Sequence, residues 1–306
     1  MKYVRNEWMK LWAKKGTWVM VALLALVIIG YTVTVKVYEV RNNAEETWQQ
    51  DVKEGIAMQN KWIEEGDESL VENVAIMQYQ LDNNISSGYV TTFSDVVSFG
   101  ASMIVLVTVF AVIVAAGIVS SEFGTGTIKM LLTRPVKRWK ILLSKLVTVV
   151  LFGLTLYVIG LALSSLIGII LYGPTSSVEL QMVDGVIKEV SPWSVIFEST
   201  FLSFSDFFMS IIFAFLIGSL FRSSSLAVGV TLVLMMMGST IVMILARFSF
   251  TKFIWLAHSD LTQHMDGRQP IIEGTTMGFS ITILAVYAFI FLAITFISFQ
   301  KRDVTA

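Results

Sequence analysis

Residues 119–139 read VSSEFGTGTIKMLLTRPVKRW, a short polar and basic segment between two long apolar runs. Glu122 stands where the first run ends. Gly124 and Gly126 follow it, and glycine permits a tight chain reversal because it has no Cβ. The pattern predicts a compact turn between two membrane helices, with basic residues at the point where the chain returns to the membrane.

The middle of this segment can form a short helix from Thr127 to Thr133, which Pro135 would end. Such a helix presents Ile128, Leu131 and Leu132 on one side. An apolar face at a polar turn is costly to leave in water, which argues for a protein partner. The alternative is that the leucines rest in the lipid interface while the basic residues only set the topology.

The composition indicates a membrane protein. Of 306 residues, 55% are hydrophobic and only 15% are charged, whereas soluble domains carry about a quarter charged residues. The mean hydropathy is +0.72. Much of the surface is therefore expected to face lipid. The chain has no cysteine, which excludes disulfides, thiol catalysis and metal sites built on cysteine.

Six segments are apolar over about 20 residues, the length that a helix needs to cross a bilayer. They are residues 17–35, 98–119, 141–171, 195–221, 226–246 and 277–299. The third and fourth are longer than needed and are expected to tilt or to extend past the hydrocarbon. The sequence predicts an all-α integral membrane protein, with one transmembrane domain covering residues 1–306.

The distribution of charge predicts the orientation of the spans, because lysine and arginine favour the cytoplasmic side. The basic residues of alternate flanking segments are Lys2, Arg5, Lys10, Lys14, Lys15, Lys129, Arg134, Lys137, Arg138, Lys140, Arg222, Lys301 and Arg302. The segment after the first span is instead rich in acids: Glu39, Glu45, Glu46, Asp51, Glu54, Glu64, Glu65, Asp67, Glu68 and Glu72. Both termini are expected in the cytoplasm, with the chain crossing the cell membrane several times.

Three segments outside the spans have recognisable patterns. Residues 1–16 place apolar side chains opposite basic ones at helical spacing, as in a helix that lies in the inner interface. Residues 36–97 have a helical apolar period and predict an extracellular hairpin of helices broken near Gly66, either a gate at the substrate exit or a solvated excursion. Residues 247–276 have too short an apolar stretch to span but are too apolar for a free loop on the extracellular side.

The pattern of Glu122, Gly124-Thr125 and the run Leu131 to Val136, in the middle of a six-span chain, resembles the cytoplasmic loop between spans two and three of ABC-2-type transporter permeases. The resemblance covers nearly the whole chain and is nearest to bacterial exporters of the antimicrobial-peptide or bacitracin group. It implies that residues 120–140 form a coupling loop that presses on a nucleotide-binding subunit. It also implies that residues 247–276 form a re-entrant segment on the extracellular side. The contact residues of the coupling loop would be Glu122, Gly124, Thr125, Gly126, Thr127, Ile128, Leu131, Leu132, Arg134, Pro135, Val136 and Arg138.

The resemblance also implies the partners. Two nucleotide-binding subunits would assemble with two permease subunits, as a homodimer or heterodimer, in the lipid bilayer, and no nucleic acid is expected to bind. ATP and Mg would bind to the partner ATPase. This chain has no Walker A motif, since Gly124 to Lys129 has the wrong spacing and no serine or threonine after the lysine. We therefore expect no cofactor and no enzymatic activity in the chain itself.

Polar residues within the spans suggest where a substrate could pass. Ser199, Ser203, Asp206 and Ser210 recur at helical spacing in span four, and an ionisable group inside a membrane usually faces a cavity or the bundle interior. They are candidates for the translocation pathway, unless the span begins later and leaves Asp206 near the interface. Two histidines, His258 and His264, lie six residues apart without cysteine, and no metal site is expected.

These patterns favour a permease that exports an amphipathic peptide, antibiotic or lipid-like substrate, in an ATP-binding cassette exporter. The alternative is a membrane sensor or immunity protein that binds an antimicrobial through its extracellular region without transporting it. An intramembrane enzyme is disfavoured because no catalytic constellation is present.

Overall fold

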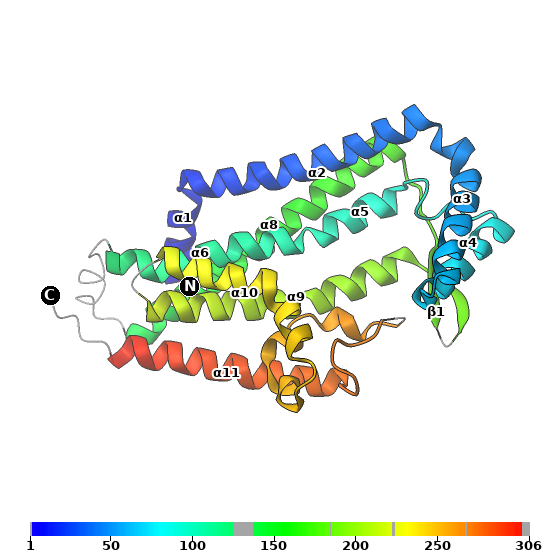
Figure 1. The fold of residues 1–306 in the computed structure, drawn as a ribbon. Helices are drawn as coiled ribbons and strands as arrows, with labels where there is room; N and C mark the ends of the chain where they lie inside the picture. The colour runs from blue at the N-terminus through cyan, green and yellow to red at the C-terminus, as the bar shows by residue number, and fades with distance from the viewer. Residues whose placement is uncertain (1, 125–136, 184, 222–223, 267, 302–306) are drawn as a thin grey trace. The chain divides into compact units, whose positions relative to one another are not determined.

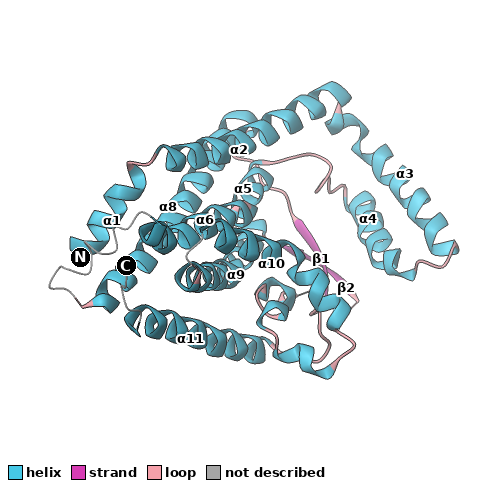
Figure 2. Ribbon diagram, turned by 60° about the vertical axis from the view of Figure 1, so that its left-hand side comes forward, coloured by secondary structure: helices cyan, strands magenta, loops and turns pink. Residues whose placement is uncertain are grey.

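The computed structural model describes residues 2–124, 137–183, 185–221, 224–266 and 268–301 (Figure 1). Most of this part is helical, and its strands form a single pair (Figure 2). Among the described residues, six helical stretches are long and apolar enough to cross a membrane. They are α2 (Lys15–Asn42), α5 (Phe93–Ser102) with α6 (Ile104–Gly124), α8 (Arg138–Tyr172), α9 (Pro192–Leu220), α10 (Ser224–Leu245) and α11 (Met277–Lys301).

Each predicted span lies within one of these stretches, apart from one residue at the end of the fourth and of the fifth span, and each stretch is longer than predicted. Their large apolar side chains are widely exposed: Leu26 is 65%, Phe197 74% and Met236 81% exposed. A soluble protein rarely exposes apolar surface so extensively, so these side chains fit contact with lipid tails. Within each helix the backbone N–H and C=O groups bond to one another, as they must in hydrocarbon, where no water can bond to them.

The second span is interrupted at Met103, where the sequence predicted one continuous helix. The hydroxyl of Ser102 donates to the carbonyl of Phe99 at 2.7 Å, within the last turn of α5. Serine that bonds back to its own helix competes with the backbone ladder and bends helices. Gly100 adds to this effect because glycine weakens a helix interior.

The chain forms two compact units, and the first comprises residues 1–24, 103–159 and 201–306. It contains the amino-terminal helix α1 (Lys2–Trp12), α6, α10 and α11. Helices α6 and α10 pack along each other. Its core is built from apolar side chains of α6, α8 and α9, none of them more than 1% exposed: Ala111, Val112, Val149, Phe152, Leu156, Phe207, Ile211 and Phe215. Helices of several separate chain segments therefore share one core.

Residues 247–276 of this unit contain three short 3-10 helices, η2 (Ser249–Phe253), η3 (Trp255–Ala257) and η4 (Leu261–His264). The η3 turn packs against α10 and α11. The side-chain amide of Gln263 organises the segment, since Nε2 donates to the carbonyls of Ala257 at 3.0 Å and Asp260 at 2.9 Å. Its Oε1 accepts from the backbone N–H of Ile271 at 3.1 Å. The segment is thus an ordered element, and its insertion into the membrane remains a prediction.

The second unit comprises residues 25–102 and 160–200. Here α3 (Ala44–Glu64), the 3-10 turn η1 (Glu68–Leu70) and α4 (Val71–Asn83) form the helical hairpin that the sequence predicted. The chain reverses at Gly66, whose φ of +108° is a conformation that glycine adopts readily. The two helices enclose a small core of Trp48, Val52 and Met77, against which Ile56, Leu81, Tyr89 and Val90 pack.

The strand pair in this unit, β1 (Glu179–Val183) and β2 (Val186–Val190), was not predicted from the sequence. The strands are antiparallel, and Val183 pairs with Val186. The two residues between them are Asp-Gly, a dipeptide that strongly favours two-residue hairpin turns. Strand β1 packs against α4, and Tyr79 Oη of α4 donates to Glu189 at 3.1 Å.

Helices α6 and α9 approach each other very closely in the first unit. A Cβ built on Gly218 would lie 2.6 Å from the carbonyl oxygen of Ala116 and 3.0 Å from its Cα. Both neighbours are backbone atoms, which cannot move without displacing α6. Only glycine allows this contact, a known device for packing membrane helices.

We expect Gly218→Ala to destabilise the protein by about 1–3 kcal/mol, the usual cost of overpacking a close contact. Gly229→Ala on α10 is the matched control, because no atom lies within 4 Å of the position that its added methyl group would take. Alanine there should be neutral or slightly stabilising, as it favours helix more than glycine. Apparent melting temperatures of the detergent-purified proteins provide the measurement, and equal values for the two variants would contradict the close contact.

Candidate functional site

The predicted coupling loop is only partly covered by the structure. Glu122 and Gly124 belong to the last turn of α6. Arg138 is the first residue of α8, and its Nη1 donates to the carbonyl of Gln300 in α11 at 3.1 Å. Nine further predicted contact residues lie outside the described residues: Thr125, Gly126, Thr127, Ile128, Leu131, Leu132, Arg134, Pro135 and Val136. The described ends of the loop are therefore two helix termini, one of which is bonded to α11.

A buried ion pair joins the amino-terminal helix to the helix that follows the loop. Lys145 Nζ of α8 lies 2.8 Å from Glu7 Oε2 of α1. Its side chain is 1% exposed and that of Glu7 is 10% exposed. Lys10 Nζ also contacts Glu7, at Oε1 and 3.1 Å, but its own side chain is 54% exposed. The carboxylate thus has a buried partner on one oxygen and an exposed partner on the other.

Two opposing effects act on the pKa of Glu7. Burial by itself raises the pKa of Glu7, because it disfavours the charged form. The charge of Lys145 and its hydrogen bond, with smaller contributions from Lys10, together outweigh burial and lower the pKa below its ordinary value of 4.5. Glu7 is therefore held as a carboxylate at neutral pH.

Apolar contacts complete the attachment of α1. Leu11 is 4% exposed, and the ring of Trp12 lies 6.1 Å from that of Phe152 in α8, edge to face. Thr17 Oγ1 at the start of α2 donates to the carbonyl of Leu11 at 2.6 Å. The basic residues Lys2, Arg5 and Lys10 are exposed, as the predicted amphipathic pattern requires. The apolar face of this helix packs on protein, a contact that the sequence did not specify.

This ion pair was not predicted from the sequence, although the position of Lys145 indicates that it needs a partner. Lys145 stands inside the apolar run 141–171, and a charge at such a position usually has a partner. The partner is 138 residues away along the chain. A hydrophobicity pattern contains no information about contacts between such distant segments, so Glu7 could not be identified.

Two of the four predicted pathway residues line one cavity. Asp206 and Ser210 of α9 line a cavity of about 230 Å³ in the first unit, together with Asp260 of the segment 247–276. Ser203 is not among the lining residues. Ser199 belongs to the second unit and donates to the carbonyl of Ile196 in its own helix at 3.2 Å. The structure thus brings two of the four together and adds a second carboxylate that the sequence pattern did not associate with them.

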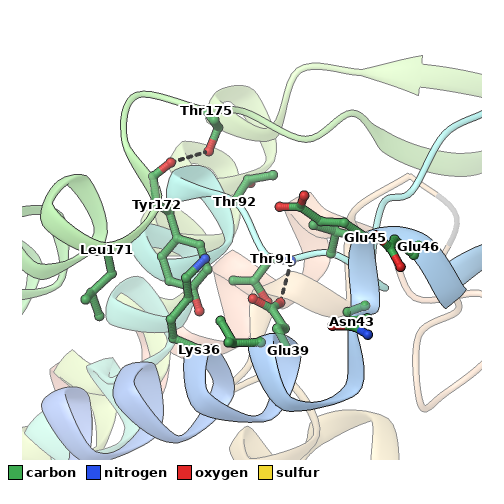
Figure 3. A pocket seen from close by; sticks show the side chains of 13 residues that line it. Lys36, Glu39, Asn43, Glu45, Glu46, Thr91, Thr92, Leu171, Tyr172 and Thr175 are labelled. Atoms are coloured by element: carbon green, nitrogen blue, oxygen red, sulfur yellow. Dashed lines mark hydrogen bonds between the residues drawn. The ribbon is translucent and has the colours of Figure 1, made fainter.

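The second unit has a larger cavity, of about 410 Å³, between the end of α2, the start of α3 and the end of α8 (Figure 3). Glu39 Oε1 accepts from the backbone N–H of Thr91 at 2.7 Å. Lys36 Nζ lies 4.5 Å from the ring centre of Tyr172. The charged residues that line this cavity are Lys36, Glu39, Glu45 and Glu46. Three carboxylates face one ammonium group, so the lining suits cationic groups.

A structural role also accounts for part of this acidic lining. Glu45 and Glu46 occupy the first turn of α3, where the positive end of the helix dipole stabilises carboxylates. Asn43 before them has the left-handed backbone conformation (φ 51°), which sharply separates α2 from α3. Asparagine tolerates this conformation better than most other residues do. The acidic residues here therefore serve the fold in addition to any ligand.

The two histidines share one serine. His258 Nδ1 lies 2.8 Å from Ser280 Oγ, and His264 Nε2 lies 2.9 Å from the same oxygen. His258 Nε2 lies 2.8 Å from the carbonyl of Lys252, which can only accept. Neutral His258 therefore carries its proton on Nε2 and accepts from Ser280, which in turn accepts from His264. Burial, with the neighbouring His258, lowers the pKa of His264 below 6.5.

This arrangement suits a structural hydrogen-bond chain better than a metal centre. When both imidazoles are neutral, each of these hydrogen bonds has one donor and one acceptor. In the described part of the protein, no group of three or more histidine, aspartate, glutamate or cysteine residues is placed to hold a metal ion. The chain of bonds fastens the segment 247–276 to α11 through Ser280.

Comparison with known proteins places the chain in a family. The family described as "Protein of unknown function (DUF2705)" matches residues 55–305. The uncharacterized protein YhcI of Bacillus subtilis strain 168 is 37% identical over 99% of this chain and 99% of its own length. The uncharacterized membrane protein YdbK of the same strain is 34% identical over 72% of this chain and 87% of its own. The chain therefore belongs to this family, and its six apolar helical stretches make it a membrane protein.

We expect Lys145→Met to destabilise the protein by about 3–5 kcal/mol, because it leaves the Glu7 carboxylate buried without its main partner. Lys10→Met is the matched control. It removes the exposed partner of the same carboxylate, and exposed pairs contribute about 0–1 kcal/mol. Melting temperatures of the purified proteins distinguish these effects. Equal decreases in melting temperature for both variants would show that the buried partner stabilises the protein no more than the exposed one.

The lowered pKa of Glu7 predicts a dependence of stability on pH. Since the folded state holds the pKa below 4.5, the contribution is complete above that value and is lost as the pH falls through the lowered folded pKa. The melting temperature of the wild type should exceed that of Glu7→Gln at about pH 7, and the difference should shrink below about pH 4.5. A difference that stays constant down to about pH 3.5 would contradict this linkage.

Proposed function

We propose that this member of the DUF2705 family is the membrane permease of an ABC-2-type exporter. It would couple to a separate ATPase subunit. The observation that carries the proposal is the sequence pattern of residues 119–139, located between the second and third of six apolar spans. The relatives are uncharacterized, so the proposal rests on this chain's own residues.

The proposed topology follows from the charges at the helix ends. Basic residues precede α2, lie at the start of α8 and end α11, and this distribution supports a cytoplasmic location of both termini and of the proposed coupling loop. The helical hairpin α3–α4, the strand pair and the segment 247–276 would then be extracellular. In a bacterium these surfaces would meet the substrate on release.

The ion pair Glu7–Lys145 supports a mechanical role for the loop. Motion at the loop reaches α8 directly, because Arg138 begins that helix and Lys145 lies two turns further on. A helix is stiff over this length, and Lys145 is fixed to α1 by a buried charge contact. When ATP binding draws the partner ATPases together, α8 and α1 would therefore move as one body. Rearranged helices would then open the pathway for an amphipathic peptide, antibiotic or lipid-like substrate.

A second candidate function is a membrane sensor or immunity protein without transport. The cavity lined by Glu39, Glu45 and Glu46 favours it, because an amphipathic cationic antimicrobial could insert a basic side chain there. This function needs no ATPase. The two proposals therefore differ in whether a partner with a Walker motif accompanies the chain.

The decisive experiment purifies the tagged chain after expression together with its neighbouring genes. We expect a stoichiometric ATPase to accompany the wild type and to be lost from the double variant Leu131→Asp, Leu132→Asp, since two carboxylates would oppose an apolar contact. Both proteins should insert into the membrane in equal amounts. Val71→Asp is the control, because it places the same charge at an apolar residue of α4 that is already 50% exposed.

Two outcomes contradict the proposal in different ways. Full assembly and transport by the double variant would show that the loop does not form the ATPase contact. A wild-type chain that purifies alone would favour the sensor or immunity protein, and binding of a cationic antimicrobial without ATP would then support that function.

A further inference from the structure

The cavity beside Asp206 brings together two carboxylates from different parts of the first unit. Asp206 lies near the middle of α9 (Pro192–Leu220), within an otherwise apolar helix. Asp260 precedes η4 in the segment 247–276 and lines the same space of about 230 Å³. A carboxylate at such a depth is expensive unless a positive charge or hydrogen bonds compensate it.

Among the described residues, no salt bridge compensates either carboxylate. Asp260 Oδ1 accepts from the backbone N–H of Thr262 at 2.9 Å, which still leaves its second oxygen available. Two basic side chains of the same segment contact other groups. Arg268 Nη1 donates to Thr262 Oγ1 at 3.0 Å, and Lys252 Nζ lies 5.3 Å from the ring centre of Phe253. None of these basic residues lines the cavity.

Ser210 provides an independent indication that a ligand belongs here. It lies one turn from Asp206 on α9, lines the same cavity and is only 1% exposed. Its hydroxyl lies close to the Asp206 carboxylate, as the Ser259 hydroxyl does, but within the described part of the chain Ser210 Oγ has no partner at ordinary hydrogen-bond distance and angle. Leaving a buried hydroxyl without a partner is costly, so such groups normally have one, often a ligand or water.

The remaining lining indicates the chemistry of the ligand. Trp255, Leu234 and Met235 supply apolar and aromatic surface to the lining. A calcium ion requires about six to eight oxygen ligands, and such a surface supplies few. An organic ammonium group instead combines hydrogen bonds to carboxylates with contact of its carbon chain and with an aromatic ring. The exposed residues Ser239 and Ile271 also line the cavity, which provides access from the surface.

We propose that the cavity formed by Asp206, Asp260 and Ser210 binds a primary alkylammonium group, either as a free amine or as the side chain of a basic peptide. The ammonium group would donate hydrogen bonds to both carboxylates and to Ser210 Oγ, while its alkyl chain lies against Trp255. This binding requires no ATPase. That the ammonium compound is the exported substrate is a second step, and this step rests on the proposed permease function.

The test is calorimetric titration of the purified full-length protein with butylammonium chloride, at constant ionic strength. We expect saturable binding, with n-butanol at least about tenfold weaker because it lacks the charge. Asp206→Asn and Asp260→Asn should each weaken butylammonium binding about tenfold or more, since each removes one charged acceptor. Glu273→Gln is the matched control, because it neutralises an exposed carboxylate of the same segment outside the cavity.

A lysine-containing tripeptide, titrated in parallel, distinguishes the two sources of the ammonium group. Tighter binding of the peptide indicates a peptide side chain, and tighter binding of butylammonium indicates a free amine. Asparagine at position 260 keeps the acceptor for Thr262, so this variant tests the site even if Asp206→Asn does not fold.

Three results would overturn the proposal. They are the absence of saturable butylammonium binding to folded protein, equal binding of butanol, and binding that neither aspartate substitution weakens. Saturable binding of sodium or calcium ions at millimolar concentration, without any binding of butylammonium, would instead assign the cavity to a metal ion. Loss of ATPase association leaves this binding unchanged, so failure of the permease proposal can be recognised separately.

Discussion

The structure depends on one constraint, namely that a backbone in hydrocarbon must satisfy its own hydrogen bonds. Helices of about 20 residues or more meet this constraint, and six such stretches account for most of the chain. Their apolar side chains can remain exposed, as Leu26, Phe197 and Met236 are, because the surrounding lipid is equally apolar. Burial of apolar surface then contributes little to association of the helices, and close contacts such as Gly218 against Ala116 become important.

The same constraint makes each charged group within a helix an exception with a cause. Lys145 is almost completely buried, and its charge is compensated by Glu7 at 2.8 Å. Desolvation of both ions consumes much of the attraction between them, so the pair adds little net stability compared with an apolar pair. The pair instead fixes the position of α1. Any other position on α8 would leave a buried charge without its partner, which is costly.

The sequence predicted the elements of this fold better than their contacts. The spans were predictable because hydrophobicity over about 20 residues is a strong local signal, and the hairpin of α3 and α4 followed from periodicity and Gly66. The strand pair was missed although Asp-Gly precedes Val186, since a short stretch of mixed polarity provides a weak signal. The pair of Glu7 with Lys145 and the shared cavity of Asp206 with Asp260 were not predictable. They join segments that are far apart in the sequence, and a single sequence contains no record of such pairings.

Lys145 and Asp206, two charged residues within apolar helices, have different surroundings. Lys145 has a partner of opposite charge within the protein and lines neither of the two cavities described above. Asp206 borders a cavity, lies near a second carboxylate and has beside it a buried hydroxyl without a partner. Selection for stability alone would remove two like charges from such a place, because a neutral amide would fill it at lower cost. Their combined presence is explained if the cavity is complete only when a cation enters it, so that the missing positive charge belongs to a ligand.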